Sequence, residues 1–199
     1  MTISWNTWTG NSSGSIVAAG TPVAVSFTTI NPHDFVTGAA SWLPASTFAD
    51  GAAVANAPQL SNHIMRLTGG NSAINTLTFS TPVVDPVISM WSLGGSATPT
   101  SFIFSSATPL LVAGGPSLEW GGSTIGVTGN TVSGTESNGT VRFAGTYSSL
   151  SWTNPTSEFW YGFNVGVASA VPEPSSALML LAGLAVAVGR ARILSARQT

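Results

Sequence analysis

The chain has 199 residues, which is room for one domain of ordinary size and a tail. Hydrophobic residues make up 43% of the chain, enough to build a core, so the composition excludes wholesale disorder. Cysteine is absent, which excludes disulfides and metal sites built on thiolates. Charged residues make up only 6% of the chain, and residues 1–170 carry two arginines against six acids, which excludes nucleic-acid binding.

Short runs of β-branched and aromatic residues alternate along residues 1–170 with Gly, Ser, Asn and Pro. Such runs predict strands joined by turns. In chain order the predicted strands are Thr2–Trp8, Val23–Thr29, His63–Leu67, Ile74–Ser80, Val87–Leu93, Ser101–Phe104, Leu110–Val112, Thr124–Val127, Thr140–Ala144, Ser148–Trp152 and Phe159–Val167. The spacing predicts an all-β fold, an antiparallel β-sandwich or jelly roll.

Two further local signals accompany the strands. Within residues 1–170, Ala45–Ala57 is the only helix-like stretch, although Asp-Gly and Pro lie within or beside it. Four glycine pairs lack the Lys and Ser or Thr of a phosphate-binding loop and predict hairpin turns: Gly69–Gly70, Gly94–Gly95, Gly114–Gly115 and Gly121–Gly122.

Candidate catalytic and metal-binding residues in the body are few. Glycoside hydrolysis needs two carboxylates that flank a cleft, and Glu119, Glu136 and Glu158 are the candidates. No fold-specific motif accompanies them, so we expect solvated charges and no enzyme. His33 and His63 lack the spacing of metal ligands, so we expect neither a metal site nor a cofactor.

Seven tryptophans are many for a body of this size. Exposed on a sheet face, tryptophan rings stack on sugar rings; buried, they fill a core that has no disulfides. We expect core packing for most of them. The possible sugar-stacking residues are Trp42, Trp91, Trp120 and Trp160.

The C-terminal residues have a different character. Residues 175–189 are almost wholly apolar and would span about 22 Å as a helix, so we predict a single short transmembrane helix there. Arg190, Arg192 and Arg197 follow it, and the positive-inside rule places them in the cytoplasm and the body outside. Val171, Pro172, Glu173 and Pro174 precede the span, and the two prolines favour an extended, accessible backbone.

Val-Pro-Glu-Pro, an apolar run and an arginine-rich end, in this order, resemble the PEP-CTERM sorting signal. The resemblance covers Val171–Thr199 and implies recognition by an exosortase, an integral membrane enzyme of Gram-negative bacteria that make exopolysaccharide. It implies that the tail is removed and that the body is delivered to the cell surface or matrix. The stretch from Gly139 to Phe163 also resembles the bodies of such proteins, which implies a β-rich extracellular module.

These observations together predict residues 1–170 as an extracellular β-sandwich and 171–199 as a sorting tail. The precursor is expected in the inner membrane, with its body on the periplasmic side and residues 175–189 in the lipid bilayer. Because the first residues lack a basic start and an apolar stretch, we expect the true gene start, with a secretion signal, upstream of Met1.

We expect a structural or adhesive role linked to exopolysaccharide, with exosortase and exopolysaccharide as partners and no nucleic acid. A carbohydrate-binding module and, less favoured, a secreted glycosidase are the alternatives. A row of exposed tryptophans would distinguish the first, and two carboxylates facing each other across a cleft the second.

Overall fold

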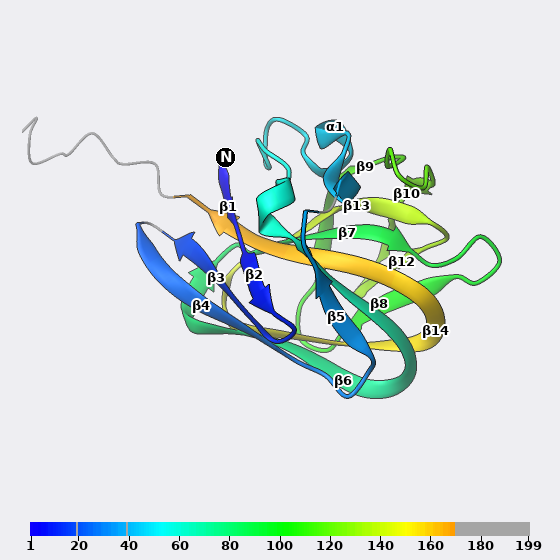
Figure 1. Cartoon of the computed structure of the whole chain (residues 1–199). Coiled ribbons are helices and arrows are strands. Elements are labelled where there is room, and N and C mark those ends of the chain that lie inside the picture. The colour runs from blue at the N-terminus through cyan, green and yellow to red at the C-terminus, as the bar shows by residue number, and fades with distance from the viewer. Residues whose placement is uncertain (19, 39, 170–199) are drawn as a thin grey trace, which may run out of the picture. The chain divides into compact units, whose positions relative to one another are not determined.

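Apolar residues at every second position form the clearest strand of the body. In the stretch Thr21–Thr28, the side chains of Val23, Val25 and Phe27 are buried, and the residues between them are exposed. This alternation places one face of the strand on the core and the other in solvent. The computed structural model describes residues 1–18, 20–38 and 40–169, and Met1–Ser169 form one compact unit (Figure 1).

Strands dominate the described residues, and helices are short. The strands are β1 (Ile3–Trp5), β2 (Thr7–Gly10), β3 (Ser13–Ala18), β4 (Thr21–Thr28), β5 (His33–Val36), β6 (Ile64–Val84), β7 (Val87–Leu93), β8 (Thr100–Phe104), β9 (Pro109–Gly114), β10 (Ser123–Thr124), β11 (Gly126–Thr128), β12 (Thr131–Gly134), β13 (Ser137–Phe143) and β14 (Thr146–Ala168). The helical turns are η1 (Ala40–Trp42), α1 (Ala45–Phe48) and η2 (Leu60–Asn62).

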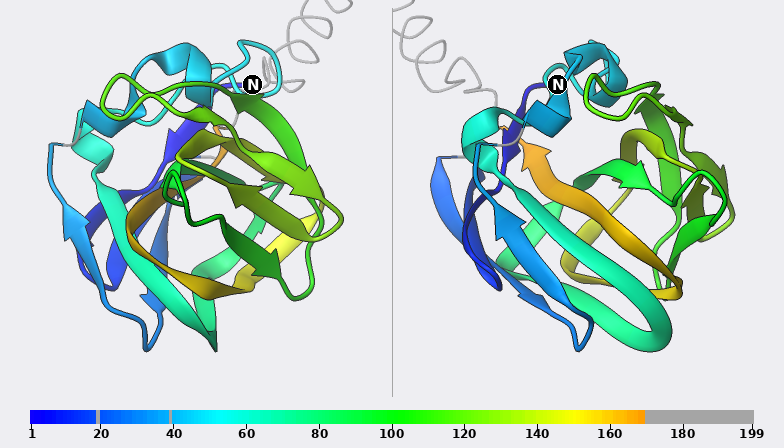
Figure 2. Two further views of the ribbon diagram at one scale, coloured as in Figure 1. Left: turned by 90° about the vertical axis from the view of Figure 1, so that its right-hand side faces the viewer. Right: turned by 45° about the vertical axis from the view of Figure 1, so that its right-hand side comes forward.

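The two longest strands, β6 and β14, run antiparallel to each other and form the spine of the sheet. The first part of β6 pairs with β5 and its later part with β4. The first part of β14 pairs with β8, and its last part with β7 and β1. Hydrogen bonds therefore join all fourteen described strands into one sheet, which curves around the core (Figure 2).

Beyond β14, the order of neighbouring strands continues through β7 and β13 to β10. Among the described strands, the pair β10 and β13 is the only parallel one. The prediction of an all-β, mostly antiparallel fold is confirmed, whereas the exact sandwich or jelly-roll topology stays a prediction.

A single large cluster of buried side chains lies inside the curved sheet. At its centre Trp152 stacks on Phe27 and Phe102, with ring centroids 5.8 and 5.3 Å apart. The Trp152 Nε1–H donates a hydrogen bond of 2.9 Å to Oδ1 of Asn154, so its polar atom is satisfied inside the core.

The segment from η1 to η2 covers the outer face of the sheet. Trp42 and Phe48 of this segment pack with Trp91 of β7, and Val54 packs with Val87. All seven residues of β7 are buried as a result, since the large core lies on the other face. This explains why large apolar residues of β7 lie on both of its faces, without the alternation of a half-buried strand.

Several local predictions are corrected. The helix is limited to α1, because Asp50 ends it by accepting hydrogen bonds from the backbone N–H groups of Ala52, Ala53 and Val54. Gly69–Gly70 lies inside β6 and is not a hairpin turn. Two predicted strands are each split: Thr2–Trp8 into β1 and β2, and Thr124–Val127 into β10 and β11. The paired predictions His63–Leu67 with Ile74–Ser80, and Ser148–Trp152 with Phe159–Val167, merge into the long bent strands β6 and β14.

Candidate functional site

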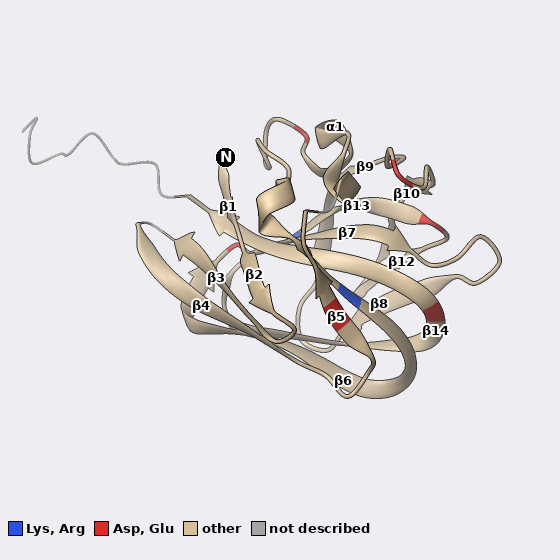
Figure 3. Cartoon of the chain, viewed as in Figure 1, with Lys and Arg blue, Asp and Glu red and all other residues tan. Residues whose placement is uncertain are grey.

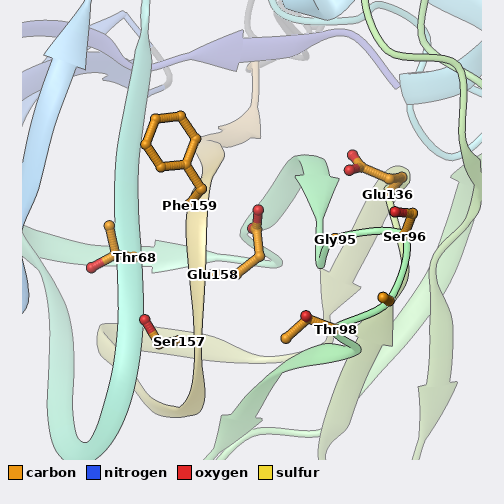
Figure 4. Close-up of a pocket in the computed structure, with 9 residues that line it drawn as sticks. Thr68, Gly95, Ser96, Thr98, Glu136, Ser157, Glu158 and Phe159 are labelled. Carbon is orange, nitrogen blue, oxygen red and sulfur yellow. The ribbon is translucent and has the colours of Figure 1, made fainter.

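An open depression on the body brings together two of the three acids considered from the sequence. Its volume is about 620 Å³. We call it the Glu136–Glu158 pocket, and its lining residues are Thr68, Gly95, Ser96, Ala97, Thr98, Glu136, Ser157, Glu158 and Phe159 (Figure 4). They come from β6, from the loop between β7 and β8, from the turn between β12 and β13, and from β14.

A local distortion of β14 supplies three consecutive lining residues, Ser157, Glu158 and Phe159. In a regular strand neighbouring side chains point to opposite faces, so three in a row do not share a pocket. Here the register between β14 and β6 shifts on both sides of Ser157. Trp160, the next residue, has a φ of 143°, a value that bulky residues rarely adopt. The distorted pairing thus turns this stretch of β14 toward the pocket.

Backbone and side-chain hydrogen bonds fix Glu136 at the opposite wall. Its N–H donates to the carbonyl oxygen of Gly94 at 2.7 Å, and the Ser92 hydroxyl donates to Glu136 Oε2 at 2.6 Å. In the adjacent loop, Gly95 and Thr98 exchange two backbone hydrogen bonds of 3.0 Å. This wall of the pocket is therefore preorganised.

Glu158 is half-buried and lies between Phe159 and Glu136 in the view of Figure 4. Its Oε2 is buried and has no hydrogen-bond partner among the described residues. Burial, with the negative charge of Glu136 as a second cause, raises the pKa of Glu158 to about 7. Near neutral pH this carboxyl group therefore exists in both protonation states and can donate or accept a hydrogen bond.

Tyr161 follows this stretch within β14, and its side chain is fully buried in the core. Its hydroxyl has no hydrogen-bond partner within the described part of the chain. Burial, and then the charge of Glu158, raise the pKa of this hydroxyl above its ordinary value. The phenol therefore stays protonated and neutral.

The remaining candidate residues lie elsewhere. Glu119 accepts a hydrogen bond of 2.9 Å from the Ser41 hydroxyl and lines a different depression. The Nδ1 atom of His33 contacts the carbonyl oxygen of Asn31 at 2.9 Å, and that of His63 accepts a hydrogen bond from the Gly38 N–H at 3.2 Å. Across residues 1–18, 20–38 and 40–169, no three His, Asp or Glu side chains are grouped as metal ligands.

The structure divides the four possible sugar-stacking tryptophans. Trp42 and Trp91 are only 2% and 7% exposed, so the prediction of sugar stacking is wrong for these two. Trp42 belongs to the segment that covers β7, and it packs with Trp91 between that segment and the sheet. Trp120 is 64% exposed at a loop tip. Trp160 is half-buried, and the guanidinium carbon of Arg66 lies 4.7 Å from its ring centroid.

The sequence analysis did not single out Phe159, the exposed aromatic residue in the lining of the pocket. Phe159 is 85% exposed, yet its position within a predicted strand gave no reason to single it out. One signal was present: Glu158, Phe159, Trp160 and Tyr161 are four large residues in a row, which is inconsistent with the alternation of a half-buried strand.

The predicted sorting residues Val171, Pro172, Glu173 and Pro174 lie outside the described residues. The same holds for the predicted span 175–189 and for Arg190, Arg192 and Arg197. Within the described part, no helix has the length and apolar character needed to cross a membrane.

Comparison with known proteins identifies this tail. Residues 170–193 match the family model of the PEP-CTERM protein-sorting motif. No curated protein and no solved structure matches the chain. The motif indicates a membrane-anchored precursor and exosortase-dependent sorting to the cell surface. By this motif the chain is a PEP-CTERM domain-containing protein.

Proposed function

We propose that the body is a non-enzymatic, structural or adhesive component of the cell envelope or extracellular matrix. The observation that carries the proposal is the sorting motif at residues 170–193, which follows the last strand of a compact all-β body. In this reading the tail determines where the body is delivered, and the body acts there through its surface.

The sequence of the tail supports a specific route for sorting. The apolar residues 175–189 halt export in the lipid bilayer, and Arg190, Arg192 and Arg197 stay in the cytoplasm. The body then lies on the periplasmic side, and Val171–Pro174 present an extended backbone to the exosortase. The catalytic residues of the processing step belong to the exosortase.

The surface of the body fits an extracellular role without nucleic acid. Charged residues are sparse along the ribbon of the body (Figure 3). Its two arginines are both paired: Arg66 with Asp34 at 2.8 Å and Arg142 with Asp85 at 2.7 Å. With both cations engaged by carboxylates, the described body offers no basic surface for phosphates.

Intact mass of the protein from native cells, with and without the exosortase gene, tests the sorting. We expect wild-type cells to yield a mass that lacks the residues beyond Pro174, and the deletion strain to yield the full-length mass in the membrane fraction. The same full-length mass in both strains would show that the tail is an ordinary anchor.

A second candidate function, carbohydrate binding, is favoured by one observation. The Glu136–Glu158 pocket combines an exposed aromatic ring with carboxyl and hydroxyl groups, as sugar-binding sites do. The same two carboxyl groups are what the glycosidase alternative requires. Incubating the chain with oligosaccharides and measuring released reducing ends separates the two; we expect none to be released.

A further inference from the structure

The exposed ring of Phe159 needs an explanation that the fold does not give. Phe159 is 85% exposed, although most large aromatic residues of the body lie in the core. Its ring centroid lies 6.5 Å from that of Trp160, which is covered in turn by Arg66. Arg66 is held by two hydrogen bonds to Asp34, of 3.0 and 2.8 Å. The Phe159 ring is thus an exposed apolar surface, and the neighbouring Trp160 ring is held in place by Arg66.

Polar groups of the pocket stand beside this ring. Glu158 is half-buried in the lining; its Oε2 atom is buried without a partner in the described part of the chain, so a ligand in the pocket contacts the other carboxyl oxygen. Glu136 keeps one carboxylate oxygen beyond its bond from Ser92. Ser96, exposed on the facing loop, adds a hydroxyl that can donate or accept. A ligand with several hydroxyl groups along one edge and an apolar face would satisfy both the ring and these groups.

The charge of the lining restricts the class of ligand. The lining contains two acids and no Lys, Arg or His. A ligand that carries carboxylate or sulfate groups would be repelled, because like charges raise the free energy of the complex. A metal ion alone is a poor match, because calcium takes six to eight oxygen ligands and leaves the aromatic ring without a role.

The geometry points to the Glu136–Glu158 pocket as a binding site for an uncharged sugar residue of a glycan, stacked on Phe159 and hydrogen-bonded to Glu158 and Glu136. A pyranose has an apolar C–H face and a rim of hydroxyls, which match the ring and the carboxyl groups. This inference rests on the carbohydrate-binding candidate above, and it specifies the residues and the sugar class.

Binding of defined oligosaccharides to the full chain tests the inference. The chain is purified in a detergent without a sugar head group and titrated with neutral hexasaccharides of glucose, mannose and galactose, and with a hexamer of galacturonic acid. We expect at least one neutral hexasaccharide to bind and the galacturonate to bind at least about tenfold more weakly.

Matched variants connect this binding to the pocket. Phe159→Ala should weaken binding at least about tenfold, whereas Phe159→Trp, which keeps a stacking surface, should change it less than about threefold. Glu158→Gln should weaken binding several-fold, because it removes a carboxylate acceptor. Trp120→Ala, which removes another exposed aromatic side chain, should leave binding unchanged. Circular dichroism checks that each variant is folded.

Four outcomes would overturn the inference: no binding of any neutral hexasaccharide, equal losses for Phe159→Ala and Trp120→Ala, tighter binding of the galacturonate, or release of reducing ends. Loss of binding in a metal chelator would also overturn it, by assigning the pocket to a cation. The sorting is tested independently, by the intact mass of the protein from native cells. A chain that reaches the surface but binds no neutral sugar contradicts the pocket assignment alone.

Discussion

At the scale of single residues, Glu158 links the pocket to the stability of the body. Its pKa is raised from 4.5 to about 7, mainly by burial and also by Glu136. A carboxyl group whose folded-state pKa is raised stabilises the fold when protonated, and this contribution is lost as the pH rises. It is fully present below about pH 4.5 and is lost as the pH passes through about 7.

We therefore expect the free energy of unfolding of the wild type to fall between about pH 4.5 and 7. Because the group is about half accessible to solvent, the fall attributable to Glu158 should be on the order of 1–2 kcal/mol. Glu158→Gln should abolish this part of the pH dependence. Glu136→Gln should move it to lower pH, because it removes the neighbouring negative charge. Urea denaturation from pH 4 to 9 measures the free energy of unfolding of all three proteins. If this free energy depended on pH in the same way in the wild type and in Glu158→Gln, the raised pKa of Glu158 would be contradicted.

At the scale of elements, β6 and β14 bend together where they line one side of the pocket. Gly69 and Gly70 in β6 have φ values of 62° and 97° and lie against the stretch of β14 from Asn154 to Ser157. A Cβ atom at Gly69 would lie 2.9 Å from the carbonyl oxygen of Asn154. The two strands therefore approach closely where β14 leaves its regular register, and the glycines permit this.

Gly69→Ala should lower the free energy of unfolding by roughly 2–5 kcal/mol, because it adds a steric clash to the cost of a left-handed conformation. Gly129 provides the matched control. Its φ of 59° is nearly the same, but a Cβ atom there would have no neighbour within 4 Å. Gly129→Ala should cost only about 1–2 kcal/mol. Chemical denaturation compares the two, and equal losses would show that the approach of β14 to β6 does not require glycine.

At the scale of the whole molecule, local sequence patterns predicted the class of fold better than they predicted the length and pairing of the strands. The predicted bounds Val87–Leu93 agree with those of β7, because a run of mostly large apolar residues there is bounded by Pro86 and Gly94. The long strands β6 and β14 were each predicted as two, because Gly69–Gly70 and Pro155 look like turns although the strand continues through them.

The pocket illustrates the same limit. Glu136 and Glu158 were candidates from the sequence, but their meeting depends on which strands neighbour each other and on register shifts in β14. Neither is encoded by local periodicity. Burial of Trp42 and Trp91 likewise depends on a covering segment without regular structure. The tail was predictable because its signal is local: a short motif, an apolar run and a group of arginines in a fixed order.

The modular character of that signal gives a prediction for the whole molecule. If residues 171–174 alone specify processing, replacing Pro172, Glu173 and Pro174 together by alanine should leave the apolar run and its arginines to anchor the precursor. We expect the full-length mass in the membrane fraction and little protein at the cell surface. Pro22→Ala, which alters an exposed proline of β4, should be processed like the wild type. Processing of the triple variant at the wild-type mass would place the recognised feature in the apolar run or the arginines instead.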